Sequence, residues 1–190
     1  MLVTNISAVT RIERTRAALL EAALDLFGEH GFDETTVAQI AARAGVTEMT
    51  FYRHFGTKDA VLVDDPYDPL IAEAVVAADP GLSSLEAAAA GVLAAWRAVP
   101  EPEVETVRDR LRLVAATPSL RAAMTRASTV TEDAVAGALQ IRGVPALEAR
   151  IASGATIGAL NSALIAWSEG PEAPLGVAIE AAASVLTGER

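Results

Sequence analysis

Residues 36 to 58 read TVAQIAARAGVTEMTFYRHFGTK, and this stretch predicts a short helix that ends in a tight turn. Thr36 followed three residues later by Gln39 is a capping box, which favours a helix that begins at Val37. Gly45 stands where this helix must end, because glycine takes the left-handed backbone conformation without the penalty of a Cβ. The stretch therefore begins with a helix and a glycine turn.

A second short helix is predicted directly after the turn, with Thr47 as its cap and residues 48–54 as its body. Apolar residues at helical spacing can hold the two helices together: Ile40, Ala41, Val46, Phe51 and Phe55. This spacing is that of a helix-turn-helix over residues 36–55, a motif that lays its second helix in the major groove of DNA.

A longer run, residues 11–62, resembles the N-terminal domain of the TetR family of transcriptional regulators. The matching elements, in order and without gaps, are AALDLF (22–27), Gly31-Phe32, TTV (35–37), IAARAGV (40–46), FYRHF (51–55) and Lys58. The resemblance implies a helix-turn-helix DNA-binding domain over 11–63. It also implies a ligand-binding and dimerisation domain over 64–190.

The composition favours an all-α fold. The chain has 190 residues, is 52% hydrophobic with much alanine, and shows neither sustained alternation nor an Asn-Gly or Asp-Gly hairpin. We expect an N-terminal three-helix domain plus a C-terminal helical bundle, with about nine helices in total. There is no cysteine, which excludes disulfides, thiolate metal sites and a cysteine nucleophile. We expect no metal and no cofactor.

Three further possibilities are disfavoured: a secreted protein, a membrane-spanning protein and an enzyme. The N-terminus lacks the pattern of a signal peptide, so the cytoplasm is expected. The uncharged stretch 151–168 is at the short limit for a bilayer span, and its hydrophobicity is diluted by polar and small residues, so a buried interface helix is expected. These residues include Ser153, Gly154, Thr156, Gly158, Asn161 and Ser162. Both histidines, His30 and His54, lie in the expected DNA-binding region, and no catalytic set is visible, so an enzyme is not expected.

The charge of the chain opposes DNA binding unless the basic residues gather locally. The net charge is −10; residues 1–63 hold six Lys/Arg and eight Asp/Glu, and residues 64–190 hold nine and seventeen. A DNA-binding protein needs a basic footprint. The footprint is therefore expected from a local cluster of Arg11, Arg14, Arg16, Arg43, Arg53 and Lys58.

Base contacts are expected from Thr47, Glu48 and Met49, because the N-terminal end of the second helix meets the base edges. Glu48 can accept from a cytosine amino group, and Met49 can press on a thymine methyl group. Alternatively, Glu48 serves only the helix dipole and contacts no base.

Phosphate contacts are expected from six residues: Thr35, Thr36, Thr50, Tyr52, His54 and Lys58. For Thr36, capping the first helix is already a sufficient role. For Tyr52, the alternative is an aromatic side chain that is half-buried by packing within the domain. His54 is alternatively a cation at the helix C-terminus. Lys58 is expected in the first turn of a helix capped by Thr57, where it either meets a phosphate or is solvated.

Proline, glycine and serine positions divide the rest of the chain into helices. The segment DDPYDP, residues 64–69, interrupts the helix after Thr57 and is either a hinge or a static kink. Later helices are predicted from Ser83-Ser84 to about Val99, then over about 103–116, 117–141, 145–168 and 175–186.

Small residues on the last two long helices predict a homodimer. Gly154, Gly158 and Ser162 recur every four residues, as do Ala155, Ala159 and Ala163, and the last helix adds Val177, Ala178, Ala181, Ala182 and Val185. The resemblance implies dimerisation through these helices and a palindromic double-stranded DNA operator. Alternatively, these faces of small residues pack inside the core of a single subunit.

The C-terminal half of the sequence suggests a class of ligand by resemblance. Residues 109–124 and the DDPYDPLI segment resemble C-terminal domains that bind acyl-CoA-like ligands, which implies a small-molecule effector and a ligand-responsive repressor. Pocket candidates are Tyr67, Trp96, Arg112, Met124 and Asn161, each with core or interface packing as the alternative. The alternative function is a constitutive DNA-binding dimer, or an activator, without an effector.

Overall fold

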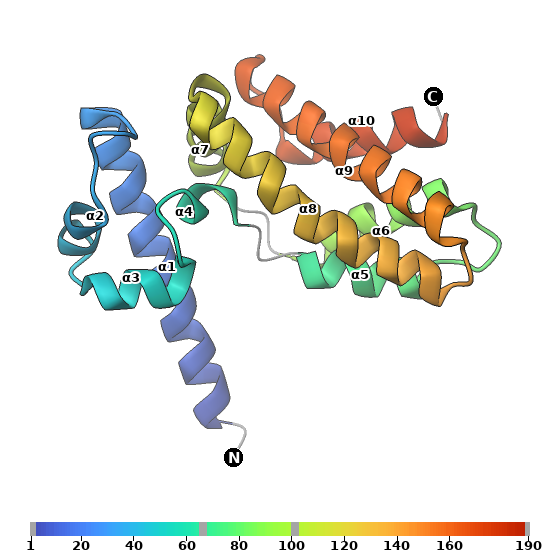
Figure 1. The fold of residues 1–190 in the computed structure, drawn as a ribbon, viewed down its shortest axis with the longest axis horizontal. Coiled ribbons are helices and arrows are strands. Elements are labelled where there is room, and N and C mark those ends of the chain that lie inside the picture. Colours follow the sequence, from blue (N-terminus) through green and yellow to red (C-terminus); the bar gives the residue numbers. More distant parts are fainter. Residues whose placement is uncertain (1–2, 65–67, 100–102, 189–190) are drawn as a thin grey trace. The chain divides into compact units, whose positions relative to one another are not determined.

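The computed structural model describes residues 3–64, 68–99 and 103–188, which form two compact units divided between Asp64 and Asp65. Within these described residues every regular element is an α-helix, as predicted (Figure 1). The described residues hold ten helices rather than about nine, because the stretch up to Ala77 contains a short helix followed by a longer one.

The first unit consists of four helices: α1 (Val3–His30), α2 (Val37–Arg43), α3 (Glu48–Phe55) and α4 (Ala60–Val63). Both α2 and α4 pack on α1, and α3 packs on α2. Leu19, Ile40 and Phe51 are fully buried, so each of the three main helices contributes to one small core.

Local signals set the ends of these helices. The backbone φ of Gly45 is +68°, the left-handed conformation that the turn was predicted to need. One prediction is wrong: Thr57 does not cap a helix. α4 begins at Ala60, and its N-cap residue, Asp59, makes no side-chain cap hydrogen bond.

The second unit contains α5 (Asp68–Ala77), α6 (Ser84–Ala98), α7 (Val104–Ala116), α8 (Pro118–Ile141), α9 (Ala146–Glu169) and α10 (Leu175–Thr187). The predicted breaks are confirmed within one or two residues. Ser83 and Glu86 form a capping box at α6, and Pro118 occupies the first turn of α8, where its missing N–H costs nothing. Residues 65–67, which form the middle of the segment 64–69 predicted as a hinge or a static kink, lie outside the described residues.

Alanine is the commonest residue in the core of the second unit, and Val, Ile, Leu and Trp167 supply the larger side chains. α8 and α9 form an antiparallel pair, α10 packs on α9 and α6, and α5 packs on α6 and α8 (Figure 1). Gly91 makes the crossing of α5 and α6 close: a Cβ at this position would overlap Val75 and lie 3.2 Å from the carbonyl oxygen of Ile71.

Candidate nucleic-acid interface

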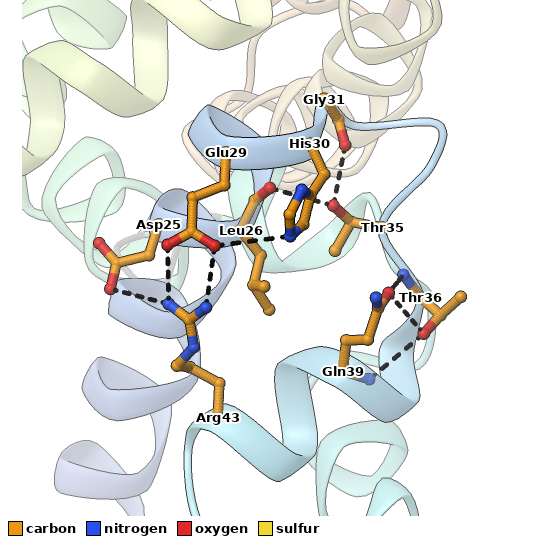
Figure 2. Close-up of polar contacts among 9 residues, drawn as sticks. All are labelled: Asp25, Leu26, Glu29, His30, Gly31, Thr35, Thr36, Gln39 and Arg43. Carbon is orange, nitrogen blue, oxygen red and sulfur yellow. Dashed lines mark hydrogen bonds and ion pairs between the residues drawn. The ribbon is translucent and has the colours of Figure 1, made fainter.

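The helix-turn-helix of the first unit is held by two N-terminal caps. The Thr36 hydroxyl oxygen accepts from the backbone N–H of Gln39 (3.2 Å), and the Gln39 side chain accepts from the backbone N–H of Thr36 (2.8 Å; Figure 2). At α3, the Thr47 hydroxyl oxygen accepts from the backbone N–H of Thr50 at 3.2 Å. Both predicted caps are confirmed, and they fix where each helix begins.

The helix α3 has one buried face and one exposed face. Phe51 is fully buried and Phe55 is 9% exposed, and their rings lie 5.5 Å apart. On the other face Met49 is 75% exposed and Tyr52 is 47% exposed, and Glu48 is also exposed. The aromatic face therefore anchors α3 to the unit, and the predicted base-contact residues stand at the surface.

Thr35 differs from the sequence-based expectation. Its side chain is only 1% exposed, and its hydroxyl lies 2.8 Å from the carbonyl oxygen of Gly31 and 3.2 Å from that of Leu26 (Figure 2). A hydroxyl buried in this way cannot reach a phosphate. Thr35 instead ties the loop before α2 to the end of α1.

The other threonines of the motif are more accessible. Thr36 is exposed, and Thr50 is half-buried with its hydroxyl oxygen 3.1 Å from that of Thr47. Both hydroxyl groups already take part in helix caps. Their predicted phosphate contacts stay predictions.

His54 is half-buried at the end of α3. Burial lowers the pKa of its imidazole, and the positive charges of Arg53 and Arg16 lower it further. A neutral ring is thereby favoured, which disfavours the alternative that His54 acts as a cation at the helix C-terminus. The carbonyl oxygen of His54 accepts instead from Arg16, at 2.7 Å.

Lys58 also differs from the expectation, because it precedes α4 and points into the unit. Its ammonium donates to the carbonyl oxygens of Phe32 (2.7 Å) and Thr35 (2.8 Å), with that of Asp33 at 3.4 Å. It also lies 4.2 Å from the centroid of the Phe32 ring. This arrangement ties the loop after α3 to the loop before α2, and a phosphate contact is not needed to explain it.

A second cation of the predicted footprint is paired within the unit. The guanidinium of Arg43 donates to both carboxylate oxygens of Glu29, at 2.9 and 3.2 Å, and lies 3.7 Å from Asp25 (Figure 2). The hydrogen bond from Arg43 lowers the pKa of Glu29, and its charge lowers that pKa further. This pair fastens α2 to α1. Arg53, another cation of the predicted footprint, is in contrast exposed on α3.

The predicted ligand residues have separate partners. Trp96 and Met124 are half-buried against the core of the second unit, and Asn161 donates to the Ser128 hydroxyl at 2.8 Å. Arg112 donates to the carbonyl oxygen of Ser168 at 2.8 Å. Tyr67 lies outside the described residues. The four described side chains have partners on different helices, and their ligand role stays a prediction.

The last two helices expose apolar side chains. Leu147 and Ile151 on α9 are 75% and 63% exposed, and Val185 on α10 is 80% exposed, while Ala178 and Ala182 are buried in the unit. α9 is long and apolar enough to cross a membrane by length and composition alone, which a core or interface helix also satisfies. Among the described residues no group of three or more His, Asp or Glu side chains could hold a metal ion.

Two family models match the chain. Residues 19–64 match the model described as bacterial regulatory proteins, tetR family, and residues 82–190, more than half of the chain, match the MftR C-terminal domain.

Individual relatives agree with these family matches. TcmR of Streptomyces glaucescens, an HTH-type transcriptional regulator, is 33% identical over 139 residues, which are 70% of this chain and 62% of TcmR. MftR of Mycobacterium tuberculosis, named for regulation of mycofactocin biosynthesis, is 29% identical over 119 residues, 60% of each chain. The chain thus spans less than two thirds of either relative.

A solved structure resembles the chain over nearly its whole length. NalD of Pseudomonas aeruginosa, described as the secondary repressor of the MexAB-OprM multidrug efflux pump, superposes with a TM-score of 0.55. The two chains are 26% identical, and the match covers 93% of this chain and 96% of NalD.

Proposed function

Because this chain belongs to the TetR family of helix-turn-helix transcriptional regulators, we propose that it is a repressor that binds a palindromic operator as a homodimer and is released by a small molecule. The relatives are described as transcriptional regulators or repressors, and the family model for bacterial regulatory proteins matches residues 19–64 of this chain. We place its action in the cytoplasm, where the DNA is.

The observation that carries this proposal is that α3 has one buried face and one exposed face. Phe51 and Phe55 fix its inner face, and Met49 and Tyr52 stand exposed on the outer face. A recognition helix needs this combination, because base contacts require side chains at the surface on a rigid support. Met49 offers an apolar contact to a thymine methyl group, and Glu48 an acceptor for a cytosine amino group.

The exposed face of α9 and α10 supports the homodimer. Leu147 and Ile151 on α9 and Val177 and Val185 on α10 are each more than half exposed, and exposed apolar side chains favour association with a partner. A two-fold dimer presents two copies of α3, so the half-sites of its operator lie about one DNA turn apart.

We propose an acyl-CoA-like molecule as the effector, bound in the second unit near Trp96, Arg112, Met124 and Asn161. The support is the resemblance of the C-terminal sequence and the alanine-rich core of this unit. The ligand can only shift binding by the difference in its affinity for the DNA-bound and released forms.

Selection of bound sequences from a random duplex library tests the DNA-binding part of the proposal. A palindromic motif with half-sites about one turn apart is expected. Met49→Ala is expected to change the preferred bases, while Tyr52→Phe weakens binding to all sequences. Absence of any enriched sequence contradicts the proposed operator binding.

The dimer and the effector need separate measurements. Light scattering on the full chain is expected to give twice the monomer mass. The double variant Leu147→Glu/Ile151→Glu is expected to lower this mass. A monomeric wild type contradicts the homodimer. Palmitoyl-CoA is expected to raise the melting temperature and release DNA, with free CoA as the control. If palmitoyl-CoA neither raises the melting temperature nor releases DNA, the alternative of a constitutive DNA-binding dimer is favoured.

A further inference from the structure

The oxidisable sulfur of this chain belongs to methionine alone. The sequence has no cysteine and three methionines, Met1, Met49 and Met124. Met1 lies outside the described residues, and Met124 is half-buried against the core of the second unit. Met49, in contrast, is 75% exposed. Because an oxidant must reach a thioether to react with it, solvent access favours oxidation of Met49 over that of Met124.

Met49 lies in the first turn of α3, but the contacts that hold this helix are made by other side chains. The cap is the hydrogen bond from the backbone N–H of Thr50 to the hydroxyl oxygen of Thr47, at 3.2 Å. The inner face is formed by Phe51 and Phe55, whose rings lie 5.5 Å apart. Neither the cap nor the aromatic face uses the thioether of Met49. A chemical change at its sulfur is therefore expected to leave the first unit folded.

The same thioether stands where the proposed regulator meets the bases. The N-terminal end of a recognition helix faces the base edges, and Met49 offers an apolar contact to a thymine methyl group there. Oxidation converts the thioether into a sulfoxide, which is polar. Burying the sulfoxide oxygen against a methyl group, without a hydrogen-bond donor, costs binding free energy. One added oxygen atom at Met49 therefore turns a favourable base contact into an unfavourable one.

We propose that Met49 is an oxidation site through which hydroperoxides keep this chain off its operator. This inference rests on the proposed DNA binding by α3 and adds an oxidant as a second input beside the small-molecule effector. Because the thioether can be restored by methionine sulfoxide reductases, the loss of operator binding is reversible.

The reaction is a two-electron oxidation of the sulfur. A lone pair of Met49 Sδ attacks one oxygen of the peroxide, and the S–O bond forms as the O–O bond breaks. The proton of the transferred hydroxyl group passes to the departing oxygen. The peroxide is thereby reduced to water, or to an alcohol when it is an organic hydroperoxide, and the thioether becomes a sulfoxide.

Bound DNA protects Met49 from the oxidant. A side chain that contacts base edges is withdrawn from solvent, so the peroxide reaches its sulfur mainly in the free protein. The expected order of events is dissociation, oxidation and then failure to rebind. The rate of Met49 oxidation should therefore fall as operator duplex is added, while the rate for Met124, in the second unit, should stay the same.

The first measurement is the site of oxidation in the full chain treated with hydrogen peroxide. Trypsin cleavage after arginine gives the peptides 44–53 and 122–126, which carry Met49 and Met124. Mass spectrometry then follows the gain of one oxygen atom in each peptide over time. Met49 is expected to be oxidised several times faster than Met124. The melting temperature of the chain oxidised at Met49 is expected to equal that of the untreated chain.

The second measurement is the affinity of the oxidised chain for the selected operator. It is expected to fall at least about tenfold for each half-site, because a buried polar group without a partner has an effect of this size. Treatment with methionine sulfoxide reductases should restore the affinity. Binding to a random-sequence duplex should hardly change, since this binding depends on phosphates rather than on base contacts.

Two leucine variants assign the effect to one sulfur. Met49→Leu keeps an apolar side chain of similar volume and cannot take up oxygen. The ratio of its operator affinities with and without peroxide should be about one, whatever its own base preference. Met124→Leu is the matched control, and its ratio should equal that of the wild type.

Several results would overturn the proposal while leaving the proposed regulator intact. They are equal oxidation rates for Met49 and Met124, unchanged operator affinity of the oxidised wild type, a lower melting temperature on oxidation of Met49, and a Met49→Leu variant that loses affinity in peroxide as the wild type does. The fully reduced wild type identifies the other failure before any peroxide is added. If it selects no operator, the proposed DNA binding fails, and the role of Met49 fails with it.

Discussion

Replacing Lys58 with Met tests whether this lysine holds the helix-turn-helix together or contacts DNA. Methionine keeps an unbranched apolar stem and removes the ammonium. The change therefore breaks the hydrogen bonds to Phe32 and Thr35 at 2.7 and 2.8 Å, and the contact 4.2 Å from the Phe32 ring. The loop before α2 then loses its tie to the loop after α3.

The expected loss is about 3.5 kcal/mol of the unfolding free energy of the first unit. Lys58 is half-buried, so each of its two short bonds is assigned about 1.5 kcal/mol, the low end for a charged donor. The ring contact adds about 0.5 kcal/mol. For a unit of this size such a loss lowers the melting temperature by roughly 14 to 28 °C.

Amide hydrogen exchange reports this loss by region. Protection of α2 and α3 in Lys58→Met should fall while protection of α8 and α9 stays at the wild-type level. The matched control is Arg53→Met, which removes an exposed cation of α3 and should lower the salt slope of DNA binding without changing protection. The reasoning is refuted if Lys58→Met leaves protection unchanged and weakens DNA binding as Arg53→Met does.

Four other substitutions have defined outcomes. Gly91→Ala should destabilise the second unit by about 1 to 3 kcal/mol in urea unfolding through overpacking against α5, whereas Gly137→Ala, where a Cβ meets nothing within 4 Å, should stabilise it by up to about 1 kcal/mol. Thr36→Ala should cost about 1 kcal/mol through loss of the α2 cap, seen as lower protection of the α2 amides. Because Arg43 lowers the pKa of Glu29, the stability from this pair is present above the ordinary carboxyl pKa and lost as pH falls through the lowered one. Arg43→Gln should return the pKa of Glu29 toward its ordinary value in an NMR titration; an unshifted titration would contradict the pairing.

The helices were predictable because their signals are local. The capping boxes at Thr36 and Ser83 and the proline at the start of α8 each act within a few residues of a helix end. The spacing of Phe51 and Phe55 likewise predicted the buried face of α3. Sequence therefore predicted the fold class and most helix limits well.

Side-chain partners far apart in sequence were not predictable in the same way. Lys58 finds its acceptors 23 to 26 residues away, and Arg43 finds Glu29 at a separation of 14. Thr35 was expected to contact a phosphate, but the end of α1 covers it and supplies two acceptors. Sequence predicted which residues are near the motif, and the packing decided which of them face outward.

The internal pairing of Arg16, Arg43 and Lys58 bears on how the protein searches a genome. Sliding along DNA depends on attraction to phosphates irrespective of sequence, and here an acidic chain presents few outward cations for it. Encounters away from the operator should therefore be brief, with the target found by repeated three-dimensional collisions instead of long one-dimensional scans. Single-molecule tracking on extended DNA should record short residence times and short scanning lengths even at low salt.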